Sequence, residues 1–187
     1  MIKFYLFKSD HALDRKTFDN IISSFYQGEF DITYLSDSKG YLVTEERFAY
    51  LISETLPIIN NDLGTKLVIV CAHAYNEVSD YALDFAFDNL HGFNYLSDVI
   101  IELMTNNLET IRRLIVDEFQ LCHHDLILTA QAYLKTGLNA KAASEMLYIH
   151  RNTFNYRLAK FIELTNLDIR DYWNAFYFNL YLRLLNK

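Results

Sequence analysis

The chain has 187 residues, which fits one large domain or two small ones, and its 51% hydrophobic and 22% charged residues exclude a mainly disordered chain. No apolar run is long enough to cross a membrane. The stretch from Met1 to Phe7 predicts a buried strand rather than a signal peptide. We therefore expect a cytoplasmic protein in which the two cysteines, Cys71 and Cys122, are reduced thiols.

The formal net charge of −7 conceals an asymmetry along the chain. Residues 121–187 hold eight Lys or Arg and five Asp or Glu, a balance of +3, whereas residues 1–120 hold nine and nineteen, a balance of −10. An acidic front half and a basic back half are typical of a regulator that contacts DNA with one end. The charge balance permits DNA binding without demonstrating it.

The first 92 residues alternate strand and helix patterns in the order β-α-β-β-α-β-α, which predicts one sheet with helices packed on it. The run Leu67-Val68-Ile69-Val70 is continuously apolar, as in a central strand covered on both faces. The predicted strands lie at 2–7, 31–35, 41–43 and 66–72, and the predicted helices at 14–25, 44–59 and 76–90.

From residue 96 onward only helical periodicity is found, with helices expected at 96–105, 108–119, 122–134, 140–147, 151–164 and 169–185. The predicted fold class is therefore α+β. It consists of a small N-terminal α/β sandwich at 1–92, a helical connector at 93–122 and an all-α domain with a helix-turn-helix at 123–187.

The segment from 139 to 164 has the pattern of two short helices joined by a tight turn. Asn139 is a good N-cap for a helix from Ala140 to Leu147. A turn at 148–150 follows, with Ile149 as its expected buried anchor, and a second helix begins near Arg151. This is the arrangement of a helix-turn-helix unit.

The second of these helices can be sorted into faces at about 100° per residue. Phe154, Leu158 and Phe161 fall together and predict the core face, and Arg151 and Arg157 flank it. The opposite side carries hydrogen-bonding and basic side chains: Asn152, Thr153, Asn155, Tyr156 and Lys160. A recognition helix needs such a face, because it reads base edges in the major groove and contacts phosphates. From the faces alone, solvated first-turn residues and a structural Arg157 remain the alternative.

The segment also resembles the C-terminal helix-turn-helix of the PucR/CdaR family of bacterial transcriptional regulators. The matching residues are Asp125-Leu126, Thr129, Ala132-Tyr133-Leu134, Asn139, Ala143, Leu147, Ile149-His150-Arg151-Asn152-Thr153, Tyr156-Arg157-Leu158, Leu164-Thr165 and Leu167-Asp168. Helix phase, charge and this resemblance together predict a DNA-contacting set: Asn139, Lys141, His150, Arg151, Asn152, Thr153, Asn155, Tyr156, Arg157 and Lys160.

The resemblance is weaker upstream and has departures. Residues 95–119 resemble the family's helical connector, and residues 1–92 resemble its GGDEF-like middle domain in element order only. The nearest string to that motif is Gly28-Glu29-Phe30, so cyclase activity is not implied, and the front half is expected to be a degenerate GGDEF-like or sensor-like domain. Asn166 stands where the family usually has Gly; Asn also tolerates the left-handed helix cap.

Other candidate sites are less persuasive. Cys122-His123-His124-Asp125 cannot all face one metal ion, because adjacent helical residues point about 100° apart. His73 with Asp80 and Asp84 could line a pocket, or His73 could be a plain structural residue. No phosphate-binding loop, dinucleotide motif or nucleophile elbow is present, so neither an enzyme nor a cofactor is expected.

The final helix raises the question of a further partner. Trp173, Phe176, Tyr177, Leu180 and Leu184 form one predicted stripe that packs on the helix-turn-helix core. More apolar side chains lie on its other sides: Tyr172, Phe178, Tyr181 and Leu182. We expect a second packing partner for this helix, either the α/β domain or another subunit.

The sequence thus predicts a cytoplasmic transcriptional regulator that binds double-stranded DNA as a homodimer. A small-molecule or protein effector at the α/β domain is left open, and no membrane contact is expected. The alternative is a non-enzymatic protein-interaction module with a degenerate helix-turn-helix.

Overall fold

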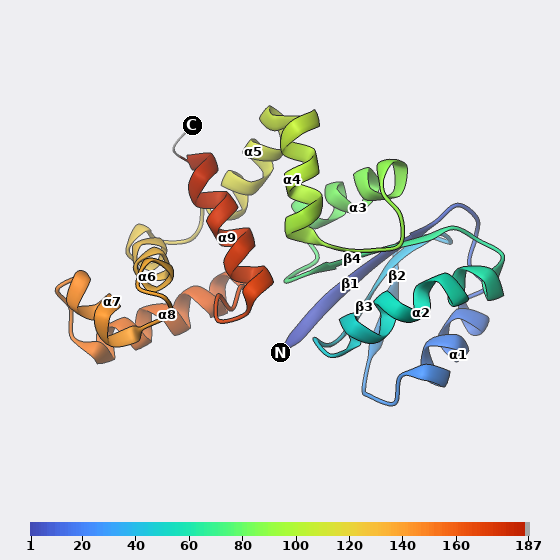
Figure 1. The fold of residues 1–187 in the computed structure, drawn as a ribbon, viewed down its shortest axis with the longest axis horizontal. Helices are drawn as coiled ribbons and strands as arrows, with labels where there is room; N and C mark the ends of the chain where they lie inside the picture. Colours follow the sequence, from blue (N-terminus) through green and yellow to red (C-terminus); the bar gives the residue numbers. More distant parts are fainter. Residues whose placement is uncertain (186–187) are drawn as a thin grey trace. The chain divides into compact units, whose positions relative to one another are not determined.

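The computed structural model describes residues 1–185 and separates into two compact units, Met1–Asn106 and Asn107–Lys187, which we call the α/β unit and the helical unit. The first contains a five-stranded sheet, and the described part of the second contains helices and their connections (Figure 1). The predicted α+β class is confirmed. The unit boundary falls inside the segment 93–122 that the sequence indicated as a connector.

The sheet of the α/β unit has the strand order β2-β3-β1-β4-β5. The strands are β1 (Ile2–Ser9), β2 (Asp31–Tyr34), β3 (Lys39–Glu45), β4 (Leu67–Ala72) and β5 (Phe93–Tyr95). β1 pairs antiparallel with β3 and β4, so that Tyr5 lies opposite both Leu42 and Cys71. β4 pairs parallel with β5. All six residues of β4 are buried, which confirms the interior strand expected from its apolar run.

Helices cover both faces of this sheet (Figure 1). α1 (Arg15–Phe25) and α2 (Phe48–Leu63) lie on one face; α3 (Glu77–Asn89) packs on β1 and β4 and against α4 (Leu96–Asn106). Asp14 begins α1 as its N-cap, accepting a hydrogen bond from the backbone N–H of Lys16. The element order β-α-β-β-α-β-α is confirmed for the first seven elements.

Two expectations for this unit were wrong. The helix expected from residue 44 begins only at Phe48, because β3 continues to Glu45, where it pairs with Ile2 of β1. Long-range strand pairing thus overrides the local helical pattern. The strand β5 was not predicted, since three residues are too short a run to be recognised as a strand and are ordered by pairing with β4.

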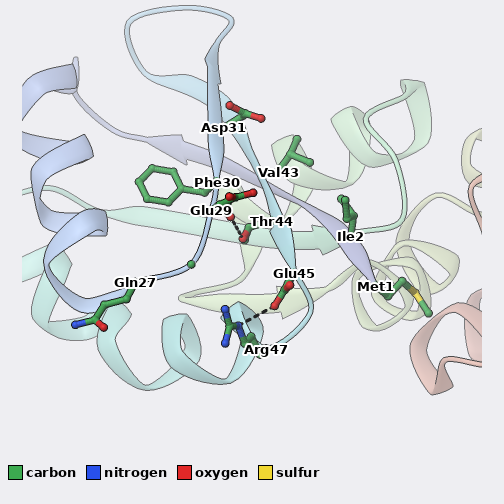
Figure 2. A pocket seen from close by; sticks show the side chains of 11 residues that line it. Met1, Ile2, Gln27, Glu29, Phe30, Asp31, Val43, Thr44, Glu45 and Arg47 are labelled. Atoms are coloured by element: carbon green, nitrogen blue, oxygen red, sulfur yellow. Dashed lines mark hydrogen bonds and ion pairs between the residues drawn. The ribbon is translucent and has the colours of Figure 1, made fainter.

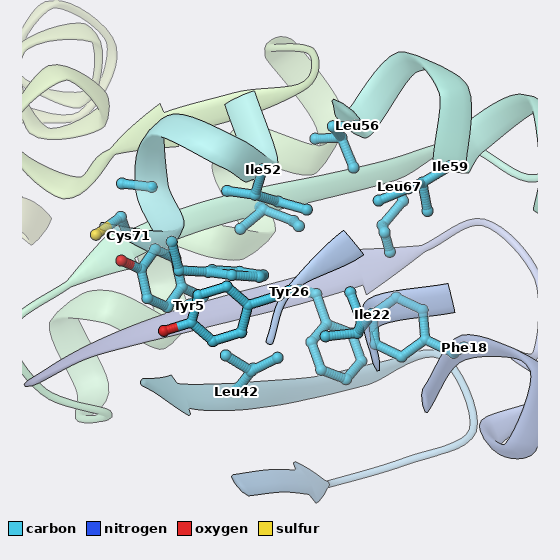
Figure 3. Close-up of a cluster of buried hydrophobic side chains, with 14 of the residues drawn as sticks. Tyr5, Phe18, Ile22, Tyr26, Leu42, Ile52, Leu56, Ile59, Leu67 and Cys71 are labelled. Carbon is cyan, nitrogen blue, oxygen red and sulfur yellow. The ribbon is translucent and has the colours of Figure 1, made fainter. Parts of the chain in front are cut away.

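The main core of the α/β unit lies between the sheet and the helices α1 and α2 (Figure 3). Phe18 and Ile22 of α1 meet Tyr5 and Phe7 of β1, and the rings of Phe7 and Phe18 lie 5.0 Å apart. Burying one such side chain contributes about 1.5–3 kcal/mol. The Tyr5 hydroxyl donates to the carbonyl of Glu45 at 3.1 Å, so this buried tyrosine keeps a polar partner.

The helical unit contains α5 (Leu108–Glu118), α6 (His124–Lys135), α7 (Ala140–Met146), α8 (Arg151–Thr165) and α9 (Tyr172–Leu185). Its aromatic core centres on Phe119, which follows α5. The ring centroid of Phe119 lies 6.4 Å from that of Phe161 on α8 and 4.0 Å from that of Tyr181 on α9. The Arg112 Nε donates to the Leu184 carbonyl at 3.1 Å, which also joins α5 to α9.

The predicted core stripe of α9 was partly wrong. Phe178 and Tyr181 are buried against Phe119, whereas Trp173 and Phe176 are only half-buried. Nearly every position of α9 is apolar, so helical periodicity could not select the inner face; the position of the Phe119 ring selects it.

Candidate nucleic-acid interface

The segment that the sequence singled out folds as α7, a short turn and α8, with α6 packed against both helices (Figure 1). Asn139 ends the preceding loop as the N-cap of α7; its Oδ1 accepts from the backbone N–H groups of Lys141 and Ala142, each at 3.1 Å. The side chain of Asn139, a predicted DNA contact, therefore already stabilises the start of α7.

The turn between α7 and α8 closes with a paired hydrogen-bond cap. The N–H of Tyr148 donates to the Glu145 carbonyl at 3.1 Å, and the N–H of Ile149 donates to the Ser144 carbonyl at 3.0 Å. This is a Schellman motif, with Tyr148 in the left-handed conformation at φ 53°. Ile149 is half-buried, so the fully buried anchor expected from the sequence was wrong: the cap itself fixes the turn.

The first turn of α8 combines a cap with exposed donors. His150 is the N-cap, and its Nδ1 accepts from the backbone N–H of Asn152 at 3.2 Å. The N–H groups of Arg151 and Thr153 have no acceptor among residues 1–185. Unpaired N–H groups at a helix start favour a nearby anion.

The two faces of α8 lie as helix phase predicted. Phe154, Leu158 and Phe161 are buried. The exposed residues of the first two turns are Arg151, Asn152, Thr153, Asn155 and Tyr156. Tyr156 is 69% exposed, which excludes a role for it in the core. The exposed face carries hydrogen-bond donors and acceptors without an acid.

The basic side chains of the predicted set divide into two groups. Arg157 is half-buried and pairs with Asp125 of α6 at 2.7 Å, and Lys160 pairs with Glu163 at 2.8 Å. The hydrogen bond from Lys160 to Glu163 raises the pKa of Lys160, which stays protonated at neutral pH. Arg151 and Lys141 are exposed and form no ion pair with any described residue.

Sequence reasoning treated Tyr148 only as part of the turn. In the structure its side chain is 96% exposed immediately before α8. Its left-handed backbone has no sequence signature, since Gly or Asn usually marks such a position. The short length of the turn between the two predicted helices was the one sequence feature that pointed to this conformation.

The neighbouring Cys122–Asp125 segment serves the fold. The His123 Nδ1 accepts from the backbone N–H of Asp125 and caps α6, while the Asp125 carboxylate holds Arg157. Burial raises the pKa of the Cys122 thiol. Residues 1–185 bring together no group of three or more His, Cys, Asp or Glu side chains suited to a metal ion.

The α/β unit has an open hollow of about 880 Å³ at the ends of β1 and β3 (Figure 2). Its polar groups engage one another: the Thr44 hydroxyl donates to the Glu29 carbonyl at 2.6 Å, and Arg47 pairs with Glu45 at 2.8 Å. The two carboxylates that the sequence grouped with His73 are engaged in ion pairs, because Asp80 pairs with Lys39 and Asp84 pairs with Lys8, each at 2.8 Å.

Comparison with known proteins identifies the kind of domain that the helical segment forms. Residues 126–184 match the PucR C-terminal helix-turn-helix domain. The chain carries a PucR-type helix-turn-helix. This domain, which we call the PucR-type domain, contains α7 and α8 and most of α6 and α9.

Two relatives and one solved structure are similar to the chain. The proline-responsive transcriptional activator PutR of Bacillus subtilis is 36% identical over 63 residues, which cover 34% of this chain and 15% of PutR. The uncharacterized protein YxkF of the same organism is 21% identical over 193 residues, covering 93% of this chain and 64% of YxkF. The chain thus spans less than two thirds of either relative. A regulator of polyketide synthase expression from Bifidobacterium adolescentis aligns with a TM-score of 0.47 at 16% identity, over 98% of this chain and 79% of that one.

The part of the chain that the structure describes contains no helix that could span a membrane.

Proposed function

We propose that the chain is a transcriptional regulator that binds duplex DNA sequence-specifically by placing α8 of its PucR-type domain in the major groove. One observation carries the proposal: α8 buries Phe154, Leu158 and Phe161 and exposes a polar and basic face on its first two turns. A helix held in this way by a helix-turn-helix presents its N-terminal residues to base edges.

Each exposed group has a role that its chemistry suits. Asn152 can pair with the two hydrogen-bonding positions of an adenine edge, and Thr153 and Tyr156 add further contacts. Arg151 and Lys141 are positively charged and contact the backbone phosphates. Arg157 is a positioning residue, because its ion pair with Asp125 ties α8 to α6.

One recognition helix reads only a few base pairs, so we propose that a homodimer binds two half-sites. Sedimentation should show a dimer, and protection of the DNA should recur after about one helical turn, roughly 10 base pairs.

A regulator of this kind acts where the DNA is, and we therefore propose that it acts in the cytoplasm. We assign it no catalytic role, and an effector would act through the α/β unit.

The alternative is a protein-interaction module. The observation that favours it is the ion pairing of Arg157 and Lys160, which leaves fewer basic groups for phosphates. The two functions differ in their response to substitution. Two results together would favour the interaction module. The unsubstituted chain would bind no duplex, and its protein partners would remain bound when Arg151 and Asn152 are both replaced by Ala.

Gel-shift titration of the full chain across a range of salt concentrations tests the proposal. The dissociation constant for duplex DNA should rise steeply with salt, because bound phosphates release counterions. Asn152→Ala should relax sequence preference, whereas Lys141→Ala should weaken binding to all sequences, because Lys141 is exposed and has no ion-pair partner among the described residues. An affinity that does not respond to salt, or the absence of preference among duplexes, would contradict the proposed function.

A further inference from the structure

The residue Tyr148, in the turn between α7 and α8, combines a strained backbone with an exposed aromatic side chain. We propose that Tyr148 contacts the DNA backbone, with its phenol hydroxyl donating to a phosphate oxygen and its ring lying against the adjoining deoxyribose. This inference rests on the proposed function and adds a contact outside the recognition helix.

The backbone of Tyr148 has a conformation that is unfavourable for a tyrosine. Its φ of 53° lies in the left-handed region, which disfavours a bulky residue. The same cap ends α6, where Gly137 at φ 64° donates to the Leu134 carbonyl at 3.1 Å and Leu138 donates to the Tyr133 carbonyl at 2.9 Å. At the equivalent position of the α6 cap the chain thus has glycine, the residue without this strain, although the next residue, Leu138, also has a positive φ of 63°.

The side chain of Tyr148 gives the fold nothing in return. It is 96% exposed, and within residues 1–185 it makes no hydrogen bond, ring contact or cation–π contact. By contrast, Tyr133 and Tyr177 of the same unit are buried. An aromatic ring that is almost fully in water at a strained position is better explained by a partner than by packing.

The place of Tyr148 indicates the chemistry of that partner. It stands two residues before His150, the N-cap of α8, and three before Arg151, whose guanidinium has no ion-pair partner in the described residues. A helix N-terminus and a nearby Arg both favour phosphate, and a phenol hydroxyl donates readily to it. Glu145 opposes this preference: it is exposed one turn earlier and is the single acid between Asn139 and Ile162.

The test compares three full-length variants by melting temperature and by affinity for duplexes selected by the unsubstituted chain from a random-sequence library. Tyr148→Gly removes the strain and the side chain, so it should melt at a higher temperature yet bind DNA about tenfold more weakly. Tyr148→Phe keeps both the strain and the ring, so its melting temperature should not change. It lacks the hydroxyl, so its DNA binding should be weakened nearly as much as that of Tyr148→Gly. Tyr172→Ala is the control, because Tyr172 is 67% exposed on α9, outside the turn, and should bind DNA normally.

The outcomes separate this inference from the function on which it rests. Suppose that the unsubstituted chain binds DNA and that Tyr148→Gly and Tyr148→Phe both bind DNA as tightly as it does. The role of Tyr148 is then overturned while the proposed function stands. If the unsubstituted chain selects no duplex, the proposed function fails first. A loss of affinity in Tyr172→Ala as large as in Tyr148→Phe would also overturn the assignment, because the effect would not be specific to the turn.

Discussion

The two units differ in what their polar side chains do. In the α/β unit, the main charged cluster is satisfied internally: Lys8 pairs with Asp84 at 2.8 Å, and Lys39 pairs with Asp80 at 2.8 Å. In the helical unit, the first two turns of α8 expose a continuous polar face, and Arg151 has no ion-pair partner among the described residues. Polar groups that the fold does not use are the ones a partner can use, so the comparison directs attention to α8.

The largest expected effects come from matched core truncations, one in each unit. Phe18→Ala should destabilise the α/β unit and Phe161→Ala the helical unit, each by about 3–5 kcal/mol, because a buried ring leaves a cavity. Phe18 is 1% exposed and Phe161 0%. Urea denaturation followed by amide hydrogen exchange measures both. Equal loss of protection in both units from either substitution would mean that they do not unfold separately.

A second matched pair tests backbone strain in the two units. Gly64, after α2, and Gly137, after α6, have φ of 61° and 64°, and a Cβ at either site would meet nothing within 4 Å. Replacing each by Ala should therefore cost only conformational energy, about 1–2 kcal/mol in both cases. Thermal unfolding of both variants checks this. A loss at one site with none at the other would contradict the expected equivalence.

Two arginines of α8 should separate binding from stability. Arg151→Ala should weaken DNA binding about tenfold and reduce the slope of log affinity against log salt by about 0.9, with unchanged stability. Arg157→Ala should lower the free energy of unfolding by at most about 1 kcal/mol, because its pair with Asp125 is partly solvent-screened. Anisotropy titrations and urea denaturation measure the two effects. If the effects are interchanged, the assigned roles are wrong.

The smallest effects are at acid pH. Burial raises the pKa of Asp84, but hydrogen bonds from Lys8 and Lys39 outweigh it, and the net pKa is lowered. In the helical unit, the hydrogen bond from Arg170 lowers the pKa of Asp168. A lowered folded-state pKa gives stability that is present above the unfolded value of about 4 and is lost as pH falls through the folded one.

Asp84→Asn should therefore flatten the acid decline in stability of the α/β unit, and Asp168→Asn that of the helical unit. Unfolding free energies measured from neutral pH down through the acid range check both, because the stability from each ion pair is lost as pH falls through the lowered folded-state pKa of the carboxyl group. An unchanged acid decline in either variant would contradict the assigned ion pair.

The features that were predictable from the sequence were those with local periodicity. The core face of α8 follows from the spacing of Phe154, Leu158 and Phe161, and Asn166 takes the left-handed cap at φ 53°. β5 and the continuation of β3 to Glu45 depend on pairing with distant strands, which no local pattern reveals.

The candidate site was predictable in the same uneven way. Exposure of Asn152 and Tyr156 followed from helix phase. The ion pair of Arg157 with Asp125 joins residues 32 apart in sequence, and its partner could not be chosen from spacing. The left-handed conformation of Tyr148 could not be predicted, because a tyrosine rarely adopts it.

The most direct test of the central claim is selection from a randomised duplex library by the unsubstituted chain and by Asn152→Ala, followed by sequencing. We predict that the unsubstituted chain enriches one motif, and that Asn152→Ala still binds but loses preference at one position of each half-site. Enrichment of no motif by the unsubstituted chain, or an identical motif from both proteins, would contradict the claim that the exposed face of α8 reads DNA sequence through Asn152.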